Sequence, residues 1–232
     1  MDKSIKNKAS WLYCGSILDE EFKLSFSNII KLSGEFYMIP ESSQDSSVRL
    51  YKASNFPKKW QYVKTLISGD GFNDPTPFLY EDKWYMFVSS SGNAKMSLYM
   101  ANTLDGDWVE HPLSPIIKNN PNAARSAGRV IEHNGKLIRF SQNTFPVYGK
   151  SVNAHQITIL TPEAYTEKLL YSDPILSGDN NGWNMDFMHH IDAHIINEND
   201  QNYIRAFVDG GSYIPIQLHG TEVVTDMKRL HK

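Results

Sequence analysis

The chain has 232 residues, of which 41% are hydrophobic and 21% charged, so we predict a packed domain rather than a disordered chain. Its formal net charge of −3 argues against nucleic acid or an anionic membrane as the main partner, because both require a concentrated basic surface. The single cysteine, Cys14, excludes an intrachain disulfide and a four-cysteine or Cys/His zinc site.

The chain begins with a polar segment, 1–10, that contains no hydrophobic stretch and is predicted to be a tail without a secretory signal. Residues 11–232 are predicted to form a single domain. No apolar run approaches the roughly 18 residues that cross a bilayer, so we expect no membrane span. Since nothing here demands an oxidising compartment, we expect a cytoplasmic protein.

Short runs rich in aromatic and β-branched residues follow along the chain, bounded by Gly, Asn, Asp or Ser, and helical periodicity is hard to find. These runs predict one outer-type strand, from Trp11 to Leu18, and then four units that each read strand, turn, strand, loop, strand, loop, strand. The units lie near 25–68, 72–117, 126–177 and 190–225. The chain is therefore predicted to be all-β.

The units repeat. Tyr37 and Tyr85 occupy matching hairpins 48 residues apart, and Trp11, Trp60 and Trp108 recur at spacings of 49 and 48. A four-strand unit repeated every 40–60 residues or so is typical of a β-propeller blade; an ordinary β-sandwich with accidental similarity is the alternative. The strand at 11–18 either completes the last blade of a four-bladed ring or is the remnant of a fifth blade.

The first strand of a propeller blade lines the axis and begins at the face where the second strand ends. The repeat offsets therefore gather six polar residues at one mouth of the ring: Asp74, Asp192, Glu41, Asp209, Ser89 and Gln142. In the first unit the position of Asp74 is taken by Phe26. Carboxylates brought close together raise one another's pKa, as acid/base chemistry requires, so Asp74, Asp192 and Glu41 are the candidate catalytic residues. Alternatively, the Asp-Pro and Asp-Gly dipeptides at 74–75 and 209–210 only bend the chain.

The densest polar cluster runs from His189 to His194. On a strand, His190, Asp192 and His194 share one face, and His189 points to the other. Alternate residues lie about 6.6 Å apart along a strand, so only neighbouring pairs could share a metal ion. We therefore expect no metal and no other cofactor, and assign His189 and His190 to substrate binding. A buried histidine cluster is the alternative.

Arg125 and Arg129 flank a small-residue entrance to the third unit. They are predicted to clamp an acidic group through paired hydrogen bonds, or alternatively to form salt bridges with the carboxylates at the mouth. Trp183 lies in a loop rich in Gly and Asn, where it either stacks on a sugar ring or packs as a plug. Gln142 and Asp209 complete the predicted substrate-binding set.

Several strings in the chain together resemble a known propeller domain. They are Tyr37-Met38-Ile39-Pro40-Glu41-Ser42-Ser43, Ser47-Val48-Arg49-Leu50-Tyr51-Lys52-Ala53, Phe56-Pro57-Lys58-Lys59-Trp60, His111-Pro112-Leu113-Ser114-Pro115, Ala127-Gly128-Arg129 and the run from Met188 to His194. The domain is the N-terminal part of plant glucosamine inositolphosphorylceramide transferases, which is in turn similar to the five-bladed propellers of family 43 glycoside hydrolases. The likeness covers about residues 11–210.

The resemblance implies a propeller with a sugar site, and it implies roles only where residues match. Asp74, in Phe72-Asn73-Asp74-Pro75, matches the hydrolase carboxylate that tunes the pKa of its neighbours. The hydrolase base has no counterpart, and the general-acid position reads Arg125-Ser126-Ala127-Gly128-Arg129, without a carboxylate. Two of the three hydrolase roles are therefore vacant.

We accordingly predict a five-bladed-type β-propeller, with four full blades and an N-terminal outer strand, that recognises a glycan or nucleotide sugar at its axial pit. The pathway implied is cell-surface glycan or glycolipid synthesis, with an adjacent transferase domain or chain as a partner. The alternatives are a glycosidase or glycosyl-transferring enzyme that uses carboxylate acid/base chemistry, and a scaffold that docks a partner enzyme domain. Nucleic acid is not expected as a partner.

Overall fold

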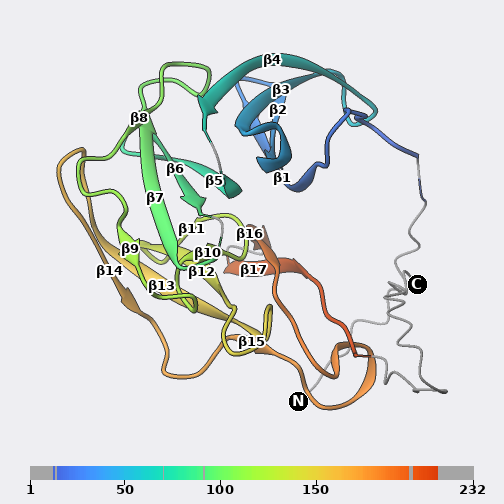
Figure 1. Ribbon diagram of the computed structural model, residues 1–232, viewed down its shortest axis with the longest axis vertical. Coiled ribbons are helices and arrows are strands. Elements are labelled where there is room, and N and C mark those ends of the chain that lie inside the picture. Colours follow the sequence, from blue (N-terminus) through green and yellow to red (C-terminus); the bar gives the residue numbers. More distant parts are fainter. Residues whose placement is uncertain (1–12, 14, 70, 91, 199–200, 214–232) are drawn as a thin grey trace, which may run out of the picture.

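The computed structural model describes residues 13, 15–69, 71–90, 92–198 and 201–213. Over these residues the regular secondary structure consists of β-strands and two short 3-10 turns, η1 (Ser43–Asp45) and η2 (Gly182–Asn184). The strands form four antiparallel sheets arranged around a common centre (Figure 1). No helix of the described part of the chain is long and apolar enough to cross a membrane.

The first two sheets each follow the order of the chain. The first contains β1 (Ser25–Leu32), β2 (Glu35–Ser42), β3 (Ser47–Asn55) and β4 (Lys59–Ser68). The second contains β5 (Asn73–Tyr80), β6 (Lys83–Ser89), β7 (Lys95–Ala101) and β8 (Val109–Glu110), with β9 (Ile117–Lys118) also paired to β7. The bounds match the predicted units at 25–68 and 72–117.

The third sheet contains six strands and the fourth sheet two described strands. The third consists of β10 (Arg125–Ser126), β11 (Ile131–His133), β12 (Lys136–Asn143), β13 (Ser151–Leu160), β14 (Tyr165–Leu169) and β15 (Leu176–Ser177). The fourth consists of β16 (Ile191–Glu198) and β17 (Gln201–Val208). Residues 214–225 of the predicted fourth unit lie outside the described residues.

The inner strands of successive sheets touch, as in a ring of propeller blades. β1 contacts β5, β5 contacts β10, and β11 contacts β16. Figure 1 shows β1, β5, β10 and β16 nearest to the common centre. The prediction of a β-propeller made from the repeat is therefore confirmed.

One detail of the prediction differs in the structure. Trp11 and Cys14 lie outside the described residues, and residues 15–18 form no strand. Gly15 has a φ of +91°, a left-handed conformation that interrupts an extended chain, and Ile17 is 40% exposed, although Leu18 packs against the first sheet. Aromatic spacing alone therefore overestimated the strand content of this segment.

The core lies between the blades. Large buried side chains of the first and second sheets pack together, among them Ile39, Leu50 and Met86. A second cluster, which includes Phe87, joins the second sheet to the third. Polar residues near the starts of the inner strands, among them Ser25, Asp74 and Arg125, instead line a central cavity.

Gly128 lets the fourth sheet approach the third. A Cβ atom at this position would lie 1.7 Å from the backbone oxygen of Ile191, so only glycine fits. The close approach allows the Ile191 N–H to donate to the Ala127 carbonyl at 2.7 Å. This junction brings the polar start of β16 next to the entrance of the third sheet.

Candidate functional site

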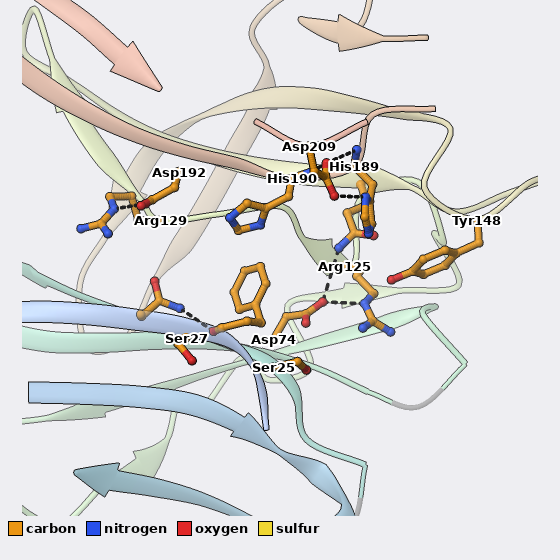
Figure 2. Close-up of a pocket in the computed structure, with 13 residues that line it drawn as sticks. Ser25, Ser27, Asp74, Arg125, Arg129, Tyr148, His189, His190, Asp192 and Asp209 are labelled. Carbon is orange, nitrogen blue, oxygen red and sulfur yellow. Dashed lines mark hydrogen bonds and ion pairs between the residues drawn. The ribbon is translucent and has the colours of Figure 1, made fainter. Parts of the chain in front are cut away.

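A cavity of about 450 Å³ opens at the centre of the ring. Residues from all four sheets line it (Figure 2): Ser25, Phe26, Ser27, Asn28, Asp74, Arg125, Arg129, Gln142, Tyr148, His189, His190, Asp192 and Asp209. Its volume falls within the range of about 300–1,000 Å³ typical of small-molecule sites. The propeller thus gathers groups up to 184 positions apart (209 minus 25) around one hollow.

Two matching positions carry an unusual backbone. Phe26 and Asp74, 48 residues apart, have φ values of +46° and +48°. Each lies at an interruption of strand register near the start of its inner strand, between Ser25 and Asn28 in β1 and between Asn73 and Thr76 in β5. Such conformations cost on the order of 1–3 kcal/mol for residues other than glycine and gather at functional sites. The bulged backbone holds both residues at the edge of the cavity.

Asp74 is the most deeply buried carboxylate of the site, with 3% of its surface exposed. Its Oδ2 accepts a hydrogen bond from Arg125 Nε at 2.5 Å, and its backbone N–H donates to Glu41 Oε2 at 2.9 Å. Burial raises the pKa of Asp74 to about 8, because the stabilising charge of Arg125 only partly offsets it and Glu41 adds a further upward shift. Asp74 is therefore a carboxyl group that can carry a proton near neutral pH.

Arg125 is held by several partners at once. Besides Asp74, its Nη1 donates to Asn93 Oδ1 at 2.7 Å, and its Nη2 lies 3.8 Å from Glu41 Oε2. Its guanidinium carbon lies 5.5 Å from the ring centre of Tyr148. The guanidinium is thus oriented before any ligand arrives.

Gln142 forms part of the floor beside Asp74. Its Nε2 donates to the Ser126 carbonyl at 2.8 Å and lies 3.5 Å from Asp74 Oδ2. Its Oε1 is buried and has no hydrogen-bond partner among the described residues. An unpaired buried acceptor costs free energy that the other contacts of Gln142 must offset.

The second ion pair of the cavity joins Arg129 to Asp192. Arg129 Nε donates to Asp192 Oδ1, and His194 Nε2 lies 3.1 Å from Asp192 Oδ2. Burial raises the pKa of Asp192, but the hydrogen bonds and charges of Arg129 and His194 outweigh it and lower the pKa below its usual value. Asp192 is therefore an ionised acceptor, unlike Asp74.

Asp209 organises the two histidines. Its Oδ1 accepts backbone N–H groups from His189 at 3.0 Å and His190 at 2.8 Å, and its Oδ2 lies 2.5 Å from His189 Nδ1. Burial raises the pKa of Asp209, but these contacts lower it overall. Burial lowers the pKa of His190, and the neighbouring carboxylates do not fully offset this effect. His190 is therefore a neutral ring at neutral pH.

The structure places most of the predicted site residues together. Eight of the ten line the cavity: Asp74, Asp192, Arg125, Arg129, His189, His190, Gln142 and Asp209. Glu41 lies directly behind Asp74, whereas Trp183 does not line the cavity and is 62% exposed. Both arginines form salt bridges with carboxylates of the mouth, the second of the two roles that the sequence allows them.

Sequence reasoning missed five lining residues: Ser25, Phe26, Ser27, Asn28 and Tyr148. The repeat offset does identify position 26, but an aromatic residue in place of a carboxylate did not signal a site. Tyr148 comes from the β12–β13 loop, for which the repeat gives no equivalent. Among the described residues, no group of three or more His, Cys, Asp or Glu is arranged to hold a metal ion.

Two solved glycoside hydrolases have a similar fold. A GH43_1 enzyme from Xanthomonas citri, complexed with xylotriose, gives a TM-score of 0.53 at 8% identity, over 82% of this chain and 68% of that one. The GH32 β-fructofuranosidase BmSUC1 of Bombyx mori gives 0.56 at 15% identity, over 83% of this chain and 44% of that one. At such identities the likeness shows the propeller fold alone.

Sequence comparison is more specific. Glucosamine inositolphosphorylceramide transferase 1 of Oryza sativa subsp. japonica is 32% identical over 204 residues, which cover 82% of this chain and 27% of that protein. The protein of the same name from Arabidopsis thaliana is 30% identical over 199 residues, 82% of this chain and 26% of that protein. The chain thus spans about a quarter of the length of these relatives. The family profile described as Glucosamine inositolphosphorylceramide transferase 1, N-terminal, matches residues 1–211, and the chain therefore belongs to that family.

Proposed function

We propose that this propeller domain recognises a carbohydrate at its central cavity and serves a pathway of cell-surface glycan or glycolipid synthesis. The pathway is supported by the name of the relatives, which are transferases. Since the chain spans about a quarter of their length, we also propose that it works beside a transferase domain or chain.

The observation that carries sugar recognition is that each of the two carboxyl groups in the cavity is held by an arginine. Asp74 is bound by Arg125 and Asp192 by Arg129, so that both carboxyl groups are fixed hydrogen-bonding groups rather than free charges. Figure 2 shows the two pairs on opposite sides of His190. A polyol such as a sugar matches this arrangement, because it offers several neutral hydroxyl groups that both donate and accept.

The presence of two carboxyl groups, Asp74 and Asp192, in one cavity makes hydrolysis of a glycoside the second candidate function. A glycosidase needs two carboxyl groups on either side of the bond, one as acid and one as base or nucleophile. The raised pKa of Asp74, to about 8, and the ionised Asp192 supply two such protonation states. Against this, the run from Arg125 to Arg129, which stands where the hydrolase resemblance expects a general acid, contains no carboxylate.

Two substitutions separate these functions. Asp74→Asn and Asp192→Asn are tested by ligand-observed NMR against methyl hexopyranosides of glucose, galactose, mannose and N-acetylglucosamine and their uridine diphosphate donors. Turnover of the same compounds is followed in parallel. Asp173→Asn, at an exposed position outside the cavity, is the matched control.

Recognition predicts binding by the wild type and the control, and no turnover. Asp192→Asn is expected to bind at least about 10-fold more weakly, since a hydrogen bond to a charged group contributes about 1.5–3 kcal/mol, and Asp74→Asn at least about 2-fold more weakly, since a hydrogen bond to a neutral group contributes about 0.5–1.5 kcal/mol. Turnover that disappears in both site variants would establish the enzyme instead. An intact fold that neither binds nor turns over any compound would leave the scaffold as the function.

A further inference from the structure

One aromatic ring at the cavity has no part in the hydrophobic core. Phe26 lines the cavity and is only partly buried. Among the described residues it belongs to none of the four hydrophobic clusters that hold the blades together. The aromatic contact that it does make is with His190, whose ring centre lies 5.2 Å away at an interplanar angle of 88°. Core packing therefore does not explain why a phenylalanine stands here.

The backbone at Phe26 is strained as well. A φ of +46° is a genuine outlier for a bulky side chain, and glycine, asparagine or aspartate would adopt it more readily. The equivalent residue of the second blade is Asp74, whose side chain faces the same cavity. The first blade thus uses the same bulge to present an apolar ring where its neighbour presents a carboxyl group.

The surroundings of this ring are polar on several sides. Asp74, Asp192 and the neutral His190 line the same cavity, and Figure 2 shows His190 between the two carboxyl groups. A flat apolar surface ringed by hydrogen-bonding groups matches a pyranose ring, which has faces of C–H bonds and a rim of hydroxyl groups. The face of an aromatic ring is negative, so it attracts polarised C–H groups and repels an anion such as phosphate.

We propose that Phe26 is a specificity-determining residue that stacks on a C–H face of a pyranose ring while the polar residues around it bind the hydroxyl groups. This inference rests on the proposed sugar recognition. It accounts for binding of the apolar C–H face of the sugar, which the charged residues do not contact. It commits the cavity to a pyranoside held by one face, with any phosphate of a sugar donor directed away from the Phe26 ring.

The test uses the same panel of methyl hexopyranosides and two substitutions at one position. Phe26→Tyr keeps the aromatic face, whereas Phe26→Leu keeps apolar bulk without it. Phe56→Leu is the matched control, because Phe56 is a partly exposed aromatic residue, 45% exposed, that does not line the cavity. The readouts are the dissociation constant, the upfield ring-current shift of the sugar ring protons, and the melting temperature of each variant.

The proposal predicts that Phe26→Tyr and Phe56→Leu bind within about twofold of the wild type, whereas Phe26→Leu binds about 3- to 10-fold more weakly and loses the upfield shift at an unchanged melting temperature. Equal binding by Phe26→Leu, or a persistent upfield shift, would overturn it while leaving sugar recognition intact. A parallel fall in affinity and melting temperature in both Phe26 variants would assign the ring to structure and overturn it as well. A wild type that binds no compound of the panel would remove the proposed function and this inference together.

Discussion

Replacing Glu167 by glutamine removes the negative charge that faces Arg139 inside the third blade. Arg139 is fully buried, and its Nε and Nη2 donate to the two carboxylate oxygens of Glu167 at 2.8 and 2.6 Å. The Tyr165 hydroxyl donates to the same carboxylate at 2.5 Å. In Glu167→Gln the size of the side chain stays the same, but the guanidinium is left as a buried charge without a counter-charge.

Two independent routes give the magnitude. Breaking a buried ion pair by removing one partner costs about 3–5 kcal/mol. Separately, burial raises the pKa of Glu167, but the charge and hydrogen bonds of Arg139 outweigh it and lower the pKa from 4.5 to about 2. A shift of this size corresponds to about 3 kcal/mol, at 1.36 kcal/mol per unit. Because the folded-state pKa is depressed, this stability is present above pH 4.5 and is lost as the pH falls toward 2.

The assay is urea denaturation from pH 7 to pH 2, together with thermal melting. At about 2–4 °C per kcal/mol for a domain of this size, Glu167→Gln is expected to melt about 6–20 °C below the wild type at pH 7 and to show no further loss between pH 4.5 and 2 from this group. The double variant Arg139→Met with Glu167→Gln should recover part of the loss, since it removes the unpaired charge. A cost below about 1 kcal/mol, or an unchanged acid profile, would refute the reasoning.

Three further outcomes are expected. Gly128→Ala should lower the free energy of unfolding by about 3 kcal/mol or more in urea denaturation, because its Cβ would lie 1.7 Å from a backbone oxygen of the fourth sheet. The control Gly135→Ala, with φ +67° and open space around it, should lower it by about 1–2 kcal/mol. Equal losses would contradict the close approach at Gly128. Burial, aided by the charge of Arg139, lowers the pKa of His155 from 6.5 to about 4. The stability that this neutral histidine contributes above pH 6.5 should therefore fall by about 3 kcal/mol as the pH drops toward 4. His155→Gln should remove this fall, and a fall that persists in the variant would assign it to another group. Trp183→Ala should change the dissociation constant for the sugar by less than about twofold, because this exposed side chain does not line the cavity. A larger change in the NMR assay would show that Trp183 takes part in binding.

The sequence by itself determined the all-β class, the blade bounds and the positions that approach the axis. These properties depend on local strand and turn preferences and on the regular spacing of the repeated units, and both can be recognised in the amino-acid sequence. Asp74 follows from the repeat offsets, for example, and Asp192 follows from them with one residue of slip. The segment at 11–18 shows the limit of this reasoning, because its aromatic spacing continues where the described residues 15–18 make no strand.

The tertiary structure decided how the gathered side chains are used. Arg125 reaches Asp74 across 51 positions and Arg129 reaches Asp192 across 63, so that the structure selects salt bridges from the two roles that the sequence left open for these arginines. Only the folded structure shows that Phe26, on a bulge, lines the cavity and that the exposed Trp183 does not. Spacing along a chain specifies which strand end a residue occupies, but the direction of its side chain, its burial and its partner depend on neighbouring blades that meet only when the ring has formed.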